Sequence, residues 1–205
     1  MSYSYYEVYN NTLRAFRGLE FPYGADEDAA YIITWLELNN LNGVNLLSTS
    51  LKEYEKGFNG KIEKHNFSKN SFDLMNNSTL MVAPNLIDYI STKMLHKDEQ
   101  LLELKNCSYV IYFIPMLVKL LNKNIYSLIK NKNKNVFKIN SKKVSLNNSL
   151  IIQNKQKKDF SIFFSKNNLL NENLDSNINL FSYNEKLSTG LNPNKYDWNK
   201  ISKIA

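Results

Sequence analysis

The stretch of residues 14–30 constrains the fold more than any other part of the chain. Gly18 follows a helical pattern, and glycine commonly supplies the left-handed residue that ends a helix. Pro22 restrains the residue before it to an extended conformation, and Gly24 then permits a turn. The acidic run at 26–28 comes next, and carboxylates stabilise the first turn of a helix. The stretch therefore predicts a helix end, a short stiff loop and a second helix start.

Arg14 and Arg17 are the only arginines among the 26 Lys and Arg residues of the chain. Their i, i+3 spacing puts them on one face of a helix. A guanidinium group binds a carboxylate with a planar set of donors that lysine lacks. We expect the two arginines to pair with the acids at 26–28 and to clamp the first two helices together. A ligand site and a partner surface remain as alternatives.

The ligand-site alternative combines two cations, one phenol and three carboxylates. Its candidate residues are Arg14, Arg17, Tyr23, Glu20, Asp26 and Glu27. The cations would hold an anionic carboxylate or phosphate ligand, and the phenol would donate a hydrogen bond to it. One of the carboxylates would act as a general base if a reaction occurs. The sequence assigns no catalytic residue beyond this hypothesis.

Three short helices are expected in residues 1–57. Ser4 and Glu7 have the spacing of a capping box, which begins the first helix. The second starts at the acidic run, and Gly57 ends the third. The three helices are predicted at residues 5–17, 26–39 and 44–57. Short helices joined by tight loops form a compact helical unit.

Two apolar runs, at 79–83 and 109–114, are followed by Pro84 and Pro115. Each run predicts a short buried strand, with proline in the first turn of the helix that follows. Two such strand–proline–helix units predict neighbouring parallel strands in one sheet. Cys107 directly precedes the second run, and we interpret it as a small buried residue rather than a nucleophile.

After residue 122, short apolar runs alternate with clusters of Asn, Lys and Ser, as in β-hairpins. The strands are predicted at 125–129, 136–139, 143–146, 150–153 and 160–164. Residues 58–78 are predicted to form a long loop with one short strand, and residues 167–179 a loop. Asn192 and Pro193 predict the start of a final helix, with Tyr196 facing the core.

These elements predict an α+β fold, in which a three-helix unit precedes a mixed sheet with strand–proline–helix units and β-hairpins. We expect a helical unit at residues 1–57 and a mixed α/β unit at residues 58–205, packed together as one domain.

The positive charge is concentrated late in the chain, where residues 119–166 carry 12 lysines and one acid, Asp159. These lysines alternate with asparagine in turn-like clusters, and no arginine accompanies them. We interpret them as solvated hairpin tips and do not expect a nucleic-acid interface, although weak polyanion binding through residues 119–166 is a further alternative.

Cys107 is the single cysteine, and His65 and His96 are the only histidines. This set has no metal-ligand spacing and no disulfide framework, so we expect no metal and a reducing compartment. No glycine-rich phosphate loop is present, and we expect no cofactor. The apolar runs are too short to span a bilayer. We therefore expect a cytoplasmic protein without membrane contact, whose partner is another protein or a second copy of itself.

The motif from Arg17-Gly18 through Gly24-Ala25-Asp26-Glu27 to Trp35-Leu36 resembles the start of a bacterial family of proteins of unknown function. The segment from Leu191-Asn192-Pro193 to Ile204 resembles the last helix of that family. Its members continue with a Tyr-Val-Pro motif and a polar tail, so we expect the natural C-terminus to lie beyond Ala205. The resemblance implies kinship with this family and implies no particular chemical activity.

The chain contains no known catalytic signature, such as a nucleophile elbow, a zincin motif or a dinucleotide fingerprint. The sequence therefore favours a non-catalytic accessory or protein-binding protein. A small-molecule enzyme or sensor that binds an anion near Arg14 and Arg17 is the alternative.

Overall fold

The structure is a computed structural model that describes residues 2–60, 62, 70–132, 134–140, 143–146, 156–167, 176–179 and 190–205. Its contacts divide the chain into two units, one formed by Met1–Phe58 with Phe181–Ala205 and the other by Asn59–Leu180. This division places the last helix with the first three helices, whereas the sequence-based division at residue 57 placed it with the mixed unit. The packing of the whole chain as one domain stays a prediction.

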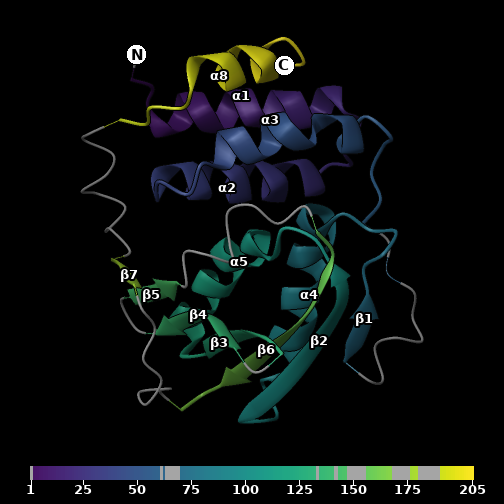
Figure 1. Ribbon diagram of the computed structural model, residues 1–205, viewed down its shortest axis with the longest axis vertical. Helices are drawn as coiled ribbons and strands as arrows, with labels where there is room; N and C mark the ends of the chain where they lie inside the picture. Colours follow the sequence, from purple (N-terminus) through teal and green to yellow (C-terminus); the bar gives the residue numbers. More distant parts are fainter. Residues whose placement is uncertain are drawn as a thin grey trace. The chain divides into compact units, whose positions relative to one another are not determined.

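The first unit consists of helices (Figure 1). They are α1 (Tyr5–Gly18), α2 (Ala25–Leu38), α3 (Gly43–Tyr54) and α8 (Lys195–Ser202). α2 packs against α1 and α3, and α8 packs against the same two helices. The predicted capping box is confirmed, because Ser4 Oγ accepts the Glu7 N–H at 3.2 Å and Glu7 Oε2 accepts the Ser4 N–H at 2.7 Å. The core is partly aromatic and includes the buried side chains of Phe16 and Tyr54.

The turn that ends α1 differs from the prediction. Gly18 lies inside the helix, and the positive φ of 61° falls on Glu20. Glycine is required at position 18 for another reason, because a Cβ there would lie 2.5 Å from the carbonyl oxygen of Ile204. The final helix also begins later than predicted, with Asn194 as its N-cap and Lys195 as its first residue. Tyr196 is 75% exposed, so the prediction that it faces the core is wrong.

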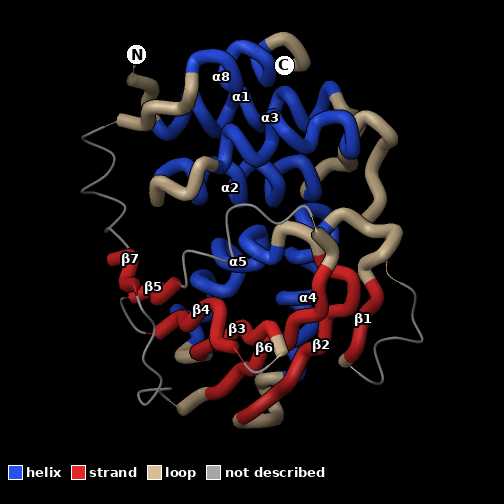
Figure 2. Tube along the Cα trace, in the orientation of Figure 1, coloured by secondary structure: helices blue, strands red, loops and turns tan. Residues whose placement is uncertain are grey.

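The second unit is a sheet with helices against it (Figure 2). The strands are β1 (Ser71–Asp73), β2 (Glu99–Cys107), β3 (Tyr126–Asn131), β4 (Lys134–Asn140), β5 (Lys143–Leu146), β6 (Lys158–Ser165) and β7 (Ser176–Asn179). The helices are α4 (Thr79–Lys93) and α5 (Phe113–Leu120). The strand order is β1-β2-β6-β3-β4-β5-β7, and all neighbouring pairs are antiparallel except β1 and β2. α4 packs against β2, and α5 packs against β3.

The α+β class, the N-terminal helices and the hairpin of β3 and β4 are confirmed. Four of the predicted late strands overlap β3, β4, β5 and β6, and only the one predicted at 125–129 begins a residue too early. The predicted strand at 150–153 lies outside the described residues. β2 was not predicted, and β7 lies in the segment predicted as a loop.

The two strands predicted before the prolines are helical. α4 already begins at Thr79 and contains Pro84, and a 3₁₀ turn at Val110–Tyr112 leads into α5, which contains Pro115. Residues 79–83 and 110–114 are all buried, and a continuous apolar run cannot distinguish a buried strand from a buried helix by periodicity. The predicted pair of parallel strands is therefore wrong, and the parallel pair that exists is β1 with β2.

Candidate functional site

The predicted clamp between the first two helices is present for one of the two arginines. Arg17 Nε in α1 donates to Asp26 Oδ2 in α2 at 2.9 Å. Asp26 Oδ1 accepts the N–H of Glu27 at 2.9 Å, and the Asp26 side chain has no exposed surface. The hydrogen bond that Arg17 donates to Asp26 raises the pKa of Arg17 above its ordinary value. The Arg17–Asp26 pair is therefore a fixed link between α1 and α2.

The other candidate residues of this region stand in solvent. Arg14, Glu20 and Glu27 are exposed, and Arg14 forms no ion pair with any described residue. Tyr23 is 90% exposed, and its ring centroid lies 5.8 Å from Arg17 Cζ. The clamp prediction is thus confirmed for Arg17 and unsupported for Arg14. The role of the six residues as a ligand site stays a hypothesis.

The electrostatic surroundings of this region are acidic. Tyr9 on α1 has a raised pKa, first because burial disfavours its phenolate and next because of the charges of Glu27 and Asp26. An anionic ligand at the start of α2 would meet the same carboxylates. The acidic surroundings therefore disfavour the anionic ligand of the ligand-site alternative.

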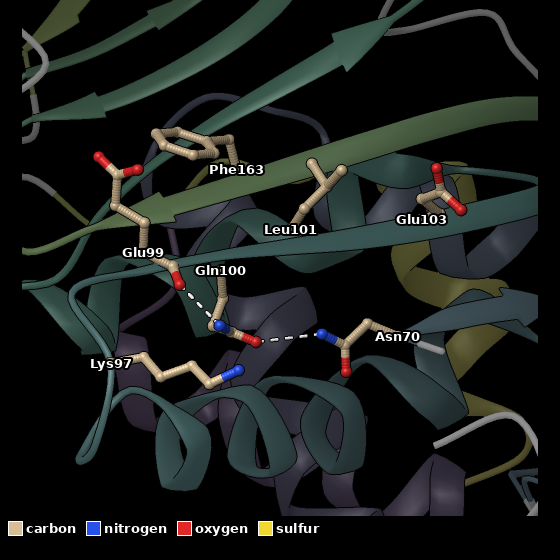
Figure 3. Close-up of a pocket in the computed structure, with 7 residues that line it drawn as sticks. All are labelled: Asn70, Lys97, Glu99, Gln100, Leu101, Glu103 and Phe163. Carbon is tan, nitrogen blue, oxygen red and sulfur yellow. Dashed lines mark hydrogen bonds between the residues drawn. The ribbon is translucent and has the colours of Figure 1, made fainter. Parts of the chain in front are cut away.

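A cavity of about 450 Å³ lies beside β2 in the second unit (Figure 3). Its lining residues come from β2, from β6, from the turn before β1 and from the loop before β2. They are Asn70, Lys97, Glu99, Gln100, Leu101, Glu103 and Phe163. None of these residues was singled out from the sequence. The side chains from Glu99 to Leu104 alternate between exposed and buried. However, Gln100 is buried and Leu101 is exposed, so the polar and apolar residues do not alternate and the sequence carries no clear signal for this strand.

A network of hydrogen bonds forms one wall of this cavity. Asn70 Nδ2 donates to Gln100 Oε1 at 3.1 Å, and Gln100 Nε2 donates to the carbonyl of Glu99 at 2.6 Å (Figure 3). Asn70 Oδ1 accepts from Lys93 Nζ at 2.6 Å and from the Tyr89 hydroxyl at 3.3 Å, both on α4. The backbone of Asn70 is left-handed, with a φ of 50°. This wall is polar, and its side chains are hydrogen-bonded to one another.

The opposite wall of the cavity is charged and partly apolar. Glu99, Leu101 and Glu103 are exposed residues of β2, whereas the residues that alternate with them, Gln100, Leu102 and Leu104, are buried. Phe163 of β6 is the register partner of Leu101 and is partly exposed. The three exposed β2 side chains share one face of the sheet, because side chains alternate along a strand.

The remaining chemical candidates do not converge on a site within the described residues. No group of three His, Cys, Asp or Glu side chains there could hold a metal ion. Cys107 is buried, and burial raises the pKa of its thiol to about 12. His96 is exposed, and His65 lies outside the described residues. No helix that the structure describes combines the length and apolarity needed to cross a bilayer.

Several lysines of residues 119–166 are engaged in local contacts. Lys123 Nζ donates to Ser91 Oγ at 2.8 Å, and Lys157 Nζ donates to the Met75 carbonyl. Lys166 Nζ lies 3.2 Å from Asp98 Oδ1. Because these contacts are made by different elements, the described lysines do not define a single surface on which a polyanion would bind.

Comparison with solved structures supports the α+β architecture. The fold is similar to that of "sulfolactate dehydrogenase from Methanocaldococcus jannaschii", with a TM-score of 0.61 and 7% sequence identity over 100% of this chain and 96% of that chain. At this identity the likeness shows the fold alone. Residues 3–79 match the model of a family described as "Protein of unknown function (DUF3726)". The expected resemblance to a family of unknown function is confirmed over these residues, which include the first three helices and β1. Comparison with curated proteins finds no match.

Proposed function

We propose that this protein is a non-catalytic accessory protein that acts by binding a protein partner. The observation that carries the proposal is the Arg17–Asp26 pair. The strongest ligand-site candidate in the sequence has its central cation bound to a buried carboxylate, in acidic surroundings. Its other members are exposed and do not enclose a small molecule.

Exposed aromatic and apolar side chains support a role in partner binding. Tyr6, Tyr23 and Tyr196 on the helical unit are between 66% and 90% exposed. Leu95 and Leu101 on the second unit are 69% and 46% exposed. Tyrosine is enriched in protein interfaces because it offers contact area at a small entropic cost. We place this role in the bacterial cytoplasm, where a single buried cysteine stays reduced.

The experiment is cross-linking in the native cell, with a photoreactive residue at Tyr23 in one variant and at Leu101 in another. A matched variant carries the photoreactive residue at Lys203, an exposed position at the end of α8. We expect one defined protein to be joined through at least one of the first two positions and not through Lys203. Absence of any defined protein adduct, together with turnover of a small molecule, would contradict the proposal.

A small-molecule enzyme or sensor is the second candidate. The likeness to a protein named a sulfolactate dehydrogenase favours it, since sulfolactate is a small anionic hydroxy acid. Arg14 and Arg17 would then hold the anion, and Glu20, Asp26 or Glu27 would serve as the base. Thermal-shift titration with sulfolactate, lactate and inorganic phosphate tests this candidate, with and without nicotinamide cofactors, the usual hydride carriers. A saturable rise in Tm that Arg17→Lys removes would favour the small-molecule function.

A further inference from the structure

We infer that the edge of β2 beside Leu101, which no described residue pairs with, binds an extended peptide of basic–polar–apolar–polar–basic sequence, which adds to the sheet as a strand. The inference rests on the proposed partner-binding function and names its site and partner class.

Among the described residues, this part of the edge has no paired strand because β1 is much shorter than β2. β1 pairs only with Glu103, Leu104 and Lys105 of the nine-residue β2. On the side of β1, Glu103 N–H donates to the Asn70 carbonyl at 2.8 Å, and the Lys105 carbonyl accepts from Leu74 at 2.9 Å. Backbone groups alternate in direction along a strand, so those of Leu101 face the same side. Within the described part of the chain, no backbone partner contacts Leu101 there.

The cavity beside β2 lies along this same edge, between Lys97, Asn70 and Leu101. Strands in a sheet lie roughly 4.8 Å apart, so an added strand occupies the space directly beside Leu101. The hydrogen-bonded wall around Asn70 is already ordered by Lys93, Tyr89 and Gln100. A preformed groove lowers the entropic cost of binding a peptide.

The exposed side chains along this edge select the chemistry of the peptide. Glu99 and Glu103 flank Leu101 on one face (Figure 3), and neither carboxylate forms an ion pair with a described residue. Cross-strand neighbours of opposite charge are favourable, as are apolar pairs. An added strand therefore complements this face when it places basic residues beside Glu99 and Glu103 and an apolar residue beside Leu101. The side chains between them face the amides of Asn70 and Gln100, which favours polar residues.

A second copy of this chain is a poor occupant of the edge. Antiparallel pairing of two β2 edges about Leu101 would set Glu99 of one copy against Glu103 of the other. Like charges directly opposite each other destabilise a strand pair. Charged residues on an edge are also a common means of preventing self-association of sheets. The same two glutamates thus favour a basic peptide and disfavour a homodimer.

The test is fluorescence anisotropy of the full chain with a labelled, end-blocked peptide of sequence Gly-Lys-Thr-Val-Thr-Lys-Gly. We expect saturable binding that weakens as salt rises, since the charge pairs are exposed. The double variant Glu99→Lys with Glu103→Lys should weaken binding by about tenfold or more. The control variant Glu53→Lys changes an exposed acid on α3 and should bind as the wild type does. The double variant should bind Gly-Glu-Thr-Val-Thr-Glu-Gly more tightly than the wild type binds it.

Backbone pairing is tested separately from charge. Methylation of the peptide nitrogens that face β2 should abolish binding, because it removes the donors of the backbone pairing. Methylation of the alternate nitrogens, which face away from β2, should leave binding intact. Hydrogen exchange at the Leu101 amide should slow on binding. Equal affinity for a scrambled peptide, unchanged affinity of the double variant, or no binding would overturn the inference. A dimer of the free protein that Leu101→Asp disrupts would overturn it in favour of a second copy. A cross-linked protein partner found through Tyr23 alone would leave the proposed function standing and this site refuted.

Discussion

Arg17 Nε lies 2.9 Å from Asp26 Oδ2, and this bond joins an arginine that is 47% exposed to a carboxylate that has no exposed surface. The pair links the last turn of α1 to the first turn of α2. A buried carboxylate needs hydrogen-bond donors, and here the Arg17 guanidinium and the Glu27 N–H supply them. The link therefore belongs to the fold of the helical unit.

Arg17→Lys should lower the melting temperature by roughly 2–5 °C, because lysine loses the fixed donor geometry at Asp26. Arg14→Lys is the matched control, since Arg14 forms no ion pair with any described residue, and it should leave the melting temperature unchanged. Differential scanning calorimetry at one pH and salt concentration measures both. Equal melting temperatures for the two variants would show that Arg17 is no clamp.

The Arg17–Asp26 pair could be predicted because its causes are local in sequence. The acidic start of α2, the loop with Pro22 and Gly24, and two arginines in a lysine-rich chain all lie within residues 14–30. The sequence could not show whether Arg14 or Arg17 pairs with Asp26. Both share one face of α1, and only the path of the loop decides which of them reaches Asp26.

The cavity beside β2 could not be predicted, because its causes are distant in sequence. Asn70 and Gln100 are 30 residues apart, and Leu101 meets Phe163 only through the pairing of β2 with β6. Sequence patterns indicate strands but not their partners. The prediction of a strand at 79–83 was wrong for a different reason. Burial on all sides removes the periodicity that distinguishes a helix from a strand.

Cys107 should react only slowly with thiol reagents in the native protein. Its side chain is fully buried, and burial raises the pKa of its thiol to about 12, although the nearby Thr79 hydroxyl lowers it in part. The reactive species is the thiolate, so labelling by a soluble disulfide reagent at pH 8 should be roughly a hundredfold slower than in denaturant. Stopped-flow absorbance measures both rates. Rapid native labelling would mean that Cys107 is accessible and would reopen its role as a nucleophile.

Glu37 on α2 should make the helical unit less stable as the pH rises above 4.5. Burial is the main cause that raises the pKa of Glu37 above its ordinary value of 4.5, and the charge of Asp197 adds to it. The N–H of Val44, which donates to Glu37 Oε2 at 3.0 Å, acts in the opposite direction. The folded state therefore holds this proton at pH values where the unfolded state has released it. Stability falls from about pH 4.5 until the folded-state pKa is passed, and then stays at the lower value.

Glu37→Gln removes this ionisation and keeps an oxygen that accepts the Val44 N–H. The variant should match the wild type near pH 4 and should melt a few degrees higher than the wild type at pH 7. Asp197→Asn should reduce the wild-type pH dependence in part, because it removes the like charge and keeps an acceptor for Asn45. Glu53→Gln, at an exposed position on α3, is the control and should have the same small effect at both pH values. A Glu37→Gln variant that is less stable than the wild type at pH 7 would mean that the Glu37 carboxylate is stabilising as an anion, in contradiction to its raised pKa.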